Sequence, residues 1–401
     1  MLPFTYNLHT RVMFGCGKLE EAGAETRDLG RKAILVTYPE IMAKLGILDR
    51  TVKSLEKQGV EVTIFDKTEP NPRCTTVDEG SKLARKKGCD VVLALGGGSA
   101  LDCAKGIAVG AITGRPIWDY IYSGPGSLPE PHNVALPIVA VPTLAAAGSE
   151  FGSGAVISNW ETHEKSLLLG DHLFPRVSIV DPELTVTVPR QLTGDGGIDI
   201  IAHAFDNYIS NTEPTPLQDR FSEGVFRTVM DYLGRALENG NDIEARSQLA
   251  WVSVIANSGI IHNGRNGAGP MHFIEHTLSG HFDISHGRGL AIAMPAVFRF
   301  NIEGDPTKYA QIAKNVFFVT DPGLSDYERG MKGIEAMEAW MKSIGMYSRL
   351  SDVGVSPDSF EKVASDTIRV YEVIGGKDGA ILNPARRLDK AGIIEVLKLA
   401  Q

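Results

Sequence analysis

The sequence predicts an α/β domain built on a parallel, Rossmann-like sheet, followed by an all-helical domain. Short β-branched runs alternate with helical stretches over the first half, a glycine-rich turn follows one of these runs, and almost every segment after residue 190 has helical periodicity. Strands that alternate with helices at this rhythm are typical of parallel βαβ units with right-handed crossovers. The chain has 401 residues, which is enough for two domains, and we place them at residues 1–187 and 188–401.

The strands expected in the first half are short apolar runs bounded by turn residues. The main strands are expected at 32–38, at 61–66, at the start of 90–99 and at 134–143. Further strands, which could form a ribbon that closes the domain, are expected at 154–159, 165–170 and 177–182. Residues 113–134 are rich in proline, glycine and aromatic side chains, so we expect a long ordered loop there.

The second half has the periodicity of amphipathic helices. Within residues 215–239, five apolar side chains are expected on one helix face. These are Phe221, Val225, Val229, Leu233 and Leu237. Ser356 and Asn383 precede two further periodic segments and are suitable N-cap residues for helices that begin there.

Composition and charge exclude several classes of protein. The formal net charge is −9, which argues against a nucleic-acid partner because such a partner needs a basic surface. The four cysteines are scattered without zinc-ribbon or disulfide spacing, which fits a reducing cytoplasm. The N-terminus lacks the layout of a signal peptide, and no apolar run approaches the ~18 residues that span a bilayer. We therefore expect a cytoplasmic protein without a membrane partner.

A glycine-rich turn joins the strand at the start of 90–99 to a helix. Its residues are Gly96, Gly97, Gly98 and Ser99. Backbone N–H groups at a helix N-terminus form an anion site, and glycines let a dinucleotide pyrophosphate approach the backbone. The turn departs from the G-x-G-x-x-G fingerprint because position 101 is leucine, so a tight turn without a ligand is the alternative interpretation. A second loop of small residues, 142–150, also follows a strand, although a plain loop explains it equally well.

Aspartate and histidine residues recur at helical spacing in two segments of the second half. Asp199 and His203 are four residues apart, as are His272 and His276, and His286 follows. On a helix this spacing places both side chains on one face. A single buried histidine more often belongs to a core, but repeated spacing favours a metal site. One carboxylate with three imidazoles suits Fe²⁺ or Zn²⁺, and an open coordination position lets such an ion polarise a carbon–oxygen bond.

In order along the chain, these motifs resemble the iron-containing (group III) alcohol dehydrogenase family, and most closely its butanol dehydrogenase and aldehyde reductase branch. The segments that carry the resemblance are 11–19, 69–72, 96–102, 142–150, 180–184, 196–210, 272–280, 285–287 and 383–388. The resemblance implies a nucleotide-binding first domain, a helical second domain and an active site between them. It also implies the metal ligands, which are Asp199, His203, His272 and His286. His276 is then a non-ligand, a proton relay or a neighbour of the nicotinamide.

The resemblance also implies a set of cofactor-binding residues, nearly all of them in the first domain. The set is Tyr38, Asn71, Gly97, Gly98, Ser99, Asp102, Thr143, Leu144, Lys165 and Leu192. Tyr38 stands where NAD-preferring members often have aspartate, so NAD and NADP both remain open. Ala146 and Ala147 replace the glycine and threonine of many members, which puts one hydroxyl contact to the cofactor in doubt.

The expected activity is hydride transfer between a nicotinamide cofactor and a small alcohol or aldehyde. Phe151, Asn263 and Arg265 are candidates to face the substrate, and an arginine there would suit an aldehyde that carries a carboxylate, sulfonate or hydroxyl. A surface arginine is the alternative. Rival functions are a glycerol or polyol dehydrogenase, a dehydroquinate-synthase-like lyase of the same architecture, and a non-catalytic cofactor-binding module. A homodimer or higher homo-oligomer is the default expectation.

Overall fold

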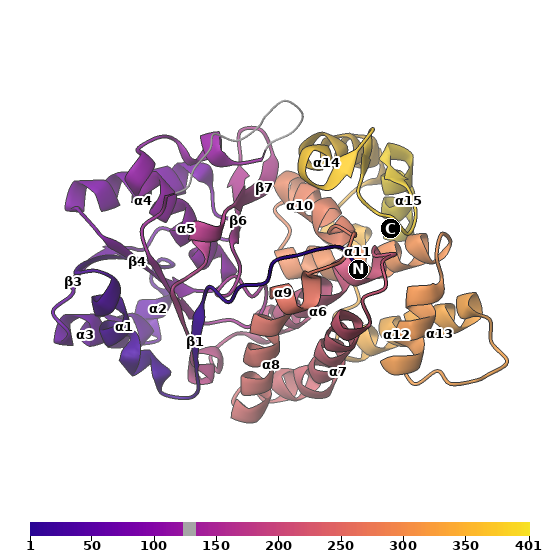
Figure 1. Cartoon of the computed structure of the whole chain (residues 1–401), viewed down its shortest axis with the longest axis horizontal. Helices are drawn as coiled ribbons and strands as arrows, with labels where there is room; N and C mark the ends of the chain where they lie inside the picture. Colours follow the sequence, from indigo (N-terminus) through magenta and orange to yellow (C-terminus); the bar gives the residue numbers. More distant parts are fainter. Residues whose placement is uncertain (123–133) are drawn as a thin grey trace.

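The computed structural model describes residues 1–122 and 134–401. Within these residues the first half of the chain forms a six-stranded sheet with the order β1-β8-β5-β4-β2-β3 (Figure 1). The strands are β1 Arg11–Phe14, β2 Lys32–Val36, β3 Glu61–Phe65, β4 Val91–Gly96, β5 Ile138–Pro142 and β8 Val177–Val180. Every neighbouring pair is parallel. The parallel α/β prediction is therefore confirmed, and the loop expected at 113–134 lies largely in 123–133, outside the described residues.

Helices cover both faces of this sheet. They are α1 Ala22–Leu29, α2 Ile41–Lys44, α3 Ile47–Lys57, α4 Cys74–Lys87 and α5 Gly98–Thr113. Alternate residues of β4 enter two separate cores. Val92 and Ala94 pack with residues of α4 and α5, whereas Leu93 and Leu95 pack with residues of α1 and α3. Because side chains alternate across a strand, a strand buried on both faces must be apolar throughout.

An antiparallel ribbon joins the two halves. Its strands are β6 Gly154–Asn159 and β7 Glu164–Leu169, which pair with each other and not with the main sheet. The ribbon contacts α5 on one side and α10 of the helical half on the other. Two of the three segments expected in the ribbon, 154–159 and 165–170, therefore form it, whereas the third, 177–182, contains β8 and pairs in the main sheet with β1 and β5. The ribbon carries Lys165 to the boundary between the halves.

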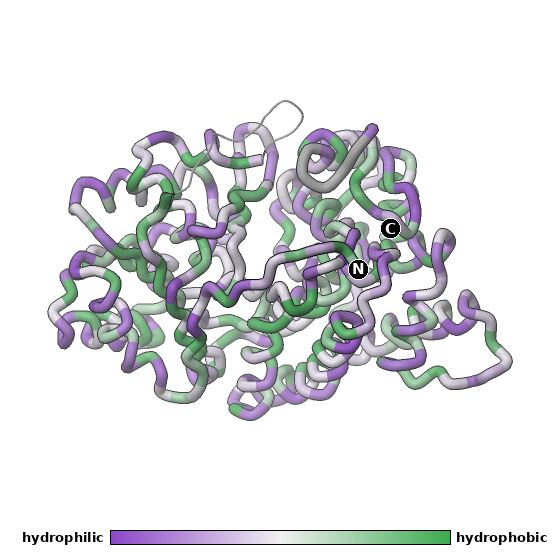
Figure 2. The backbone as a smooth tube through the Cα atoms, viewed as in Figure 1, coloured by the Kyte–Doolittle hydropathy of each residue, from purple (hydrophilic) through white to green (hydrophobic). Residues whose placement is uncertain are grey.

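The second half is helical, as expected. Its helices are α6 Arg190–Ile209, α7 Pro216–Glu238, α8 Ile243–Ala256, α9 Gly259–His262, α10 Pro270–Phe282, α11 His286–Ile302, α12 Thr307–Asn315, α13 Asp326–Ser343, α14 Phe360–Gly375 and α15 Lys390–Leu399. The described part of this half also holds a small three-stranded sheet of β9 Gly376–Lys377, β10 Ala380–Ile381 and β11 Leu388–Asp389. Figure 2 shows hydrophobic residues along the inner strands and helices, with hydrophilic residues mainly on the outer turns.

Two local predictions in the helical half are wrong. Phe221 is 41% exposed, although Val225 and Leu233 of the same series are buried. Residues four apart drift by about 40° per step around a helix, so the first member of a long series leaves the buried face. Asn383 does not cap a helix, because its side chain hydrogen-bonds to Asn301 and to the carbonyl of Arg386. The last helix begins at residue 390 and is capped by Asp389, whereas Ser356 caps the turn before α14, as predicted.

Two segments of the described chain cross between the halves. β8 ends at Val180 and α6 begins at Arg190, and we propose that the domain boundary lies at residue 187 within this connection. The first residues run from β1 onto the helical half (Figure 1), where the backbone N–H of Leu2 donates to the carbonyl of Gly264 at 2.8 Å. Within the described ranges, no helix is both long and apolar enough to span a membrane.

Candidate active site

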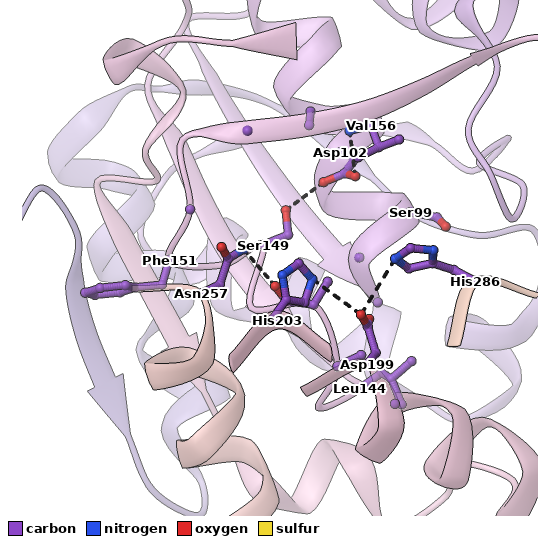
Figure 3. A pocket seen from close by; sticks show the side chains of 18 of the residues that line it. Ser99, Asp102, Leu144, Ser149, Phe151, Val156, Asp199, His203, Asn257 and His286 are labelled. Atoms are coloured by element: carbon purple, nitrogen blue, oxygen red, sulfur yellow. Dashed lines mark hydrogen bonds and ion pairs between the residues drawn. The ribbon is translucent and has the colours of Figure 1, made fainter. Parts of the chain in front are cut away.

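Four predicted metal ligands converge from three helices. Asp199 and His203 lie on α6, His272 lies on α10, and His286 is the first residue of α11. One potential ligand atom from each lies within 4.8 Å of the others. Oδ1 of Asp199 lies 3.3 Å from Nε2 of His203, 3.9 Å from Nε2 of His272 and 3.6 Å from Nε2 of His286. Figure 3 shows Asp199 between the rings of His203 and His286.

The four side chains fit a divalent cation. Oδ1 of Asp199, Nε2 of His203 and Nε2 of His272 are buried and have no hydrogen-bond partner in the described part of the chain. Buried polar atoms are otherwise almost always paired, so three that face a common point indicate a missing ligand. One carboxylate oxygen with three imidazole nitrogens is a donor set that both iron and zinc accept.

The ionisation of the ligands is consistent with this set. Burial opposes the ionisation of Asp199, but the nearby imidazoles of His286 and His203 lower its pKa to about 2. Burial lowers the pKa of His203 to about 3, so this imidazole is neutral. Burial also favours neutral His272, yet the carboxylates of Asp199 and Asp206 raise its pKa to about 9. A cation bound here would therefore displace a proton from His272.

Two further carboxylates orient the histidine ligands. Oδ2 of Asp206 lies 2.7 Å from Nδ1 of His272, and Asp206 also accepts the backbone N–H groups of residues 271 and 272. Oε2 of the fully buried Glu275 hydrogen-bonds to Nδ1 of His286. Such partners hold one ring nitrogen so that the other faces the metal. Glu275 is not among the residues predicted from the sequence, although an acidic residue inside a histidine block was a signal for it.

A glycine explains how His286 reaches the other ligands. A Cβ atom on Gly287 would lie 2.2 Å from the backbone oxygen of Asp195. The start of α11 therefore packs directly on the backbone of α6, one turn before Asp199. Only glycine permits this approach.

His276 occupies a position beside the ligand cluster. It groups with Glu275 and His286, not with Asp199. Its Nδ1 lies 2.8 Å from the hydroxyl of Tyr371, and burial holds its pKa well below the ordinary value. Nζ of Lys165 lies 3.5 Å from Oε2 of Glu275 and 3.4 Å from Nδ1 of His286.

The cluster opens into a cavity of about 1280 Å³. All ten residues of the predicted cofactor set line the same cavity. They come from the loops after β2, β3 and β5, from the start of α5, and from β7 and α6. The glycine turn lies at the N-terminus of α5, as predicted. Gly96 has φ +153°, and a Cβ there would lie 2.7 Å from the ring of Tyr38, so glycine is required at this turn.

A network of hydrogen bonds connects α5 to the 149–156 loop beside the cavity. Asp102 accepts from the hydroxyl of Ser149 at 2.7 Å and from the backbone N–H of Val156 at 2.9 Å (Figure 3). Nζ of the buried Lys105, with three N–H donors, lies 2.9 Å from Oγ of Ser149 and within hydrogen-bond distance of the carbonyl oxygens of residues 149, 152 and 154. These contacts fix the 149–156 loop relative to α5.

The structure separates the three substrate candidates. Phe151 and Asn263 line the cavity, and Arg265 is not among the described residues that do. The expectation that Arg265 faces the cleft is therefore corrected. Its guanidinium pairs with Asp219 at 3.1 Å and with Ser222 at 3.2 Å, away from the cavity. Sequence reasoning also missed lining residues that come from the N-terminal segment and from around α9, and these are Thr5, Tyr6, Asn7, His9, Asn257 and His262.

Comparisons with known proteins identify one family along nearly the whole chain. The family profile described as iron-containing alcohol dehydrogenase matches residues 9–182, and the C-terminal profile of the same family matches residues 193–400. NADH-dependent butanol dehydrogenase B of Clostridium acetobutylicum is 35% identical over 99% of each chain. The 1,3-propanediol dehydrogenase of Citrobacter freundii is 33% identical over 99% of this chain and 98% of its own. The structure of NADH-dependent butanol dehydrogenase A from Thermotoga maritima superposes with a TM-score of 0.92 at 33% identity, covering 100% and 99% of the two chains.

Proposed function

Because the chain belongs to the iron-containing alcohol dehydrogenase family and is an NAD-dependent alcohol dehydrogenase, we propose that it interconverts short, uncharged alcohols and aldehydes. The observation that carries the proposal is that one cavity contains both the Asp–His cluster and the glycine turn. A nicotinamide cofactor and a substrate oxygen can therefore meet in the same enclosed space.

The metal site in this proposal consists of Asp199, His203, His272 and His286, and the ion is Fe²⁺ or Zn²⁺. The chemistry that such an ion supplies when bound is Lewis-acid polarisation of the carbon–oxygen bond at which hydride is exchanged. Asp206 and Glu275 keep two of the imidazoles oriented toward it.

The cofactor in this proposal lies along the ten predicted lining residues, nine of the first half and Leu192 at the start of α6. The backbone N–H groups of Gly97, Gly98 and Ser99 at the start of α5 bind the pyrophosphate. Asn71 contacts the adenosine ribose, and Lys165 lies at the nicotinamide end. NAD is the preferred cofactor over NADP, because no arginine and no lysine other than Lys165 is among the described residues that line the cavity. A 2′-phosphate would therefore lack a cationic partner at the Tyr38 end.

The charge of the cavity supports an uncharged substrate. The described lining contains four aspartates, namely Asp102, Asp171, Asp195 and Asp199, but only one lysine and no arginine. The single ammonium, that of Lys165, already lies beside Glu275. A carboxylate or sulfonate on the substrate would enter without a free cation to offset its desolvation. The apolar ring of Phe151 and the amide of Asn263 instead suit a short aliphatic or hydroxylated chain.

The experiment is an NADH-oxidation assay with aldehydes matched in length. Butanal and 3-hydroxypropanal should turn over steadily, and succinic semialdehyde should have a kcat/KM at least about tenfold lower, which corresponds to about 1.4 kcal/mol. Glycerol with NAD⁺ tests the polyol alternative. A preference for the carboxylated aldehyde would contradict the proposal.

A further inference from the structure

We propose that Tyr371 is a positioning residue that fixes the tautomer of His276 and leaves Nε2 of that imidazole free to accept a proton inside the cavity. Tyr371 lies on α14, is fully buried, and follows His276 by 95 residues in the chain. The predicted effect on turnover rests on the proposed function, whereas the assignment of the His276 tautomer is independent of it.

The hydrogen bonds of Tyr371 determine which nitrogen of His276 carries hydrogen. The phenol hydroxyl donates to the backbone carbonyl oxygen of Lys165, which can only accept. A hydroxyl has one hydrogen, so toward Nδ1 of His276, 2.8 Å away, the same oxygen can only accept. Nδ1 of His276 must therefore carry the N–H. In the neutral imidazole only one ring nitrogen carries hydrogen, so Nε2 then has a free lone pair.

Within the residues that the structure describes, Nε2 of His276 makes no hydrogen bond, whereas Nδ1 contacts Tyr371. The nearest carboxylate oxygen, Oε2 of Glu275, is 4.0 Å away. That oxygen already accepts from Nδ1 of His286 and lies 3.5 Å from Nζ of Lys165. His276 itself lines the cavity. Its unprotonated nitrogen is thus held close to the ligand cluster without belonging to it.

Packing prevents the phenol from turning away. The ring of Tyr371 stacks on Phe273 with centroids 4.4 Å apart and an interplanar angle of 15°, and Phe273 lies three residues before His276 on α10. The hydroxyl also connects three elements, because Lys165 is on β7 of the first half and His276 is on α10 of the second. The tautomer of His276 is therefore maintained only while the ribbon and the helical half remain in contact.

The direct test is NMR of protein labelled with ¹⁵N-histidine, in metal-free and zinc-loaded forms. His276→Gln identifies the signals of His276. The wild-type protein should show Nδ1 protonated and Nε2 unprotonated, and Tyr371→Phe, which keeps the stacked ring, should show a mixture of both tautomers. Tyr309→Phe is the matched control, since Tyr309 is equally buried but does not line the cavity, and it should leave the pattern unchanged. A wild-type His276 protonated at Nε2, or an unchanged pattern in Tyr371→Phe, overturns the proposal.

Steady-state kinetics test whether Tyr371 affects catalysis through His276. Tyr371→Phe should lower kcat by about tenfold with little change in the KM for NADH, as is typical for loss of an orienting partner. The effect should vanish in the His276→Gln background, because a positioning residue acts through the group that it positions. An equal loss in both backgrounds would show a merely structural role. If no aldehyde turns over at all, the proposed function fails while the NMR result still decides the tautomer.

Discussion

Gly287 lies directly against the backbone oxygen of Asp195, closer than any side chain could approach, since an added Cβ would lie 2.2 Å from it. This contact brings the start of α11, and with it His286, to the helix that carries Asp199. The geometry of the ligand cluster thus depends on Gly287, which is not itself a metal ligand.

Gly287→Ala should therefore displace His286 and weaken zinc binding by roughly 10–100-fold, the range seen when ligand orientation is lost. Competition with a chromogenic chelator measures the affinity. Gly224→Ala on α7 is the control, because a Cβ there meets nothing within 4 Å. It should raise the free energy of unfolding by about 0.5–1 kcal/mol and leave zinc affinity unchanged. Equal zinc affinity in both variants would mean that the close packing does not position His286.

Asp206→Asn should also weaken zinc binding by roughly 10–100-fold. The wild-type carboxylate accepts from Nδ1 of His272 and from two backbone N–H groups at the start of α10. An amide replaces one acceptor oxygen by a donor, so at least one of these N–H groups loses its partner. Glu361→Gln, at an exposed position, is the control. The orienting role would be refuted by an Asp206→Asn protein with wild-type zinc affinity.

Most of the candidate site could be predicted from the amino-acid sequence. Asp199, His203, His272 and His286 were predicted as a set by helical spacing together with family resemblance, and the structure brings them together. Five of the six strands of the main sheet were predictable because a sheet buried on both faces leaves apolar runs between turn residues. The edge strand β1 was not expected, since none of its four residues is buried. These features are local in the sequence or repeat at a fixed period.

The partners of the site were not predictable, for physical reasons. Tyr371 is 95 residues from His276, and nothing local indicates that the two side chains meet. Arg265 lies in the loop that leads into α10 and its ligand His272, which is why the sequence predicts it in the cleft. The direction of its side chain is set by Asp219 on α7, a tertiary contact with no periodic signal. The Asn383 cap failed because a short sheet intervenes before α15.

Arg265→Ala should destabilise the protein and leave substrate preference intact. Removing one partner of a buried ion pair typically costs about 3–5 kcal/mol of stability, and both side chains of this pair are at most 4% exposed. Asp219 keeps a second cation, since Nζ of Lys308 lies 2.5 Å from its Oδ2, so the expected cost is smaller, about 1.5–3 kcal/mol. Arg387→Ala, which breaks an ion pair with 61% and 38% exposed side chains, should cost less than about 1 kcal/mol. Denaturant unfolding compares the two. A rise in KM confined to carboxylated aldehydes would instead assign Arg265 to the substrate.

Glu150 should make the stability of the metal-free protein depend on pH. Burial raises the pKa of Glu150 from 4.5 to about 7. Because the folded pKa is the higher one, the stability that the protonated carboxyl contributes is lost as pH rises from 4.5 to about 7. Glu150→Gln imitates the protonated form and does not titrate. As pH rises through this window, its free energy of unfolding should therefore increase relative to that of the wild type by up to about 3 kcal/mol. A constant difference between the two proteins from pH 4 to pH 8 would contradict the assignment.

The central claim is that Asp199, His203, His272 and His286 hold one divalent ion that turnover requires. The most direct measurement is metal content together with NADH-dependent reduction of butanal, before and after chelation and after addition of Fe²⁺ or Zn²⁺. We predict one equivalent of metal per active chain, loss of turnover when it is removed, and recovery with added metal in the wild type but not in Asp199→Asn. Full turnover by the metal-free wild-type protein would contradict the account.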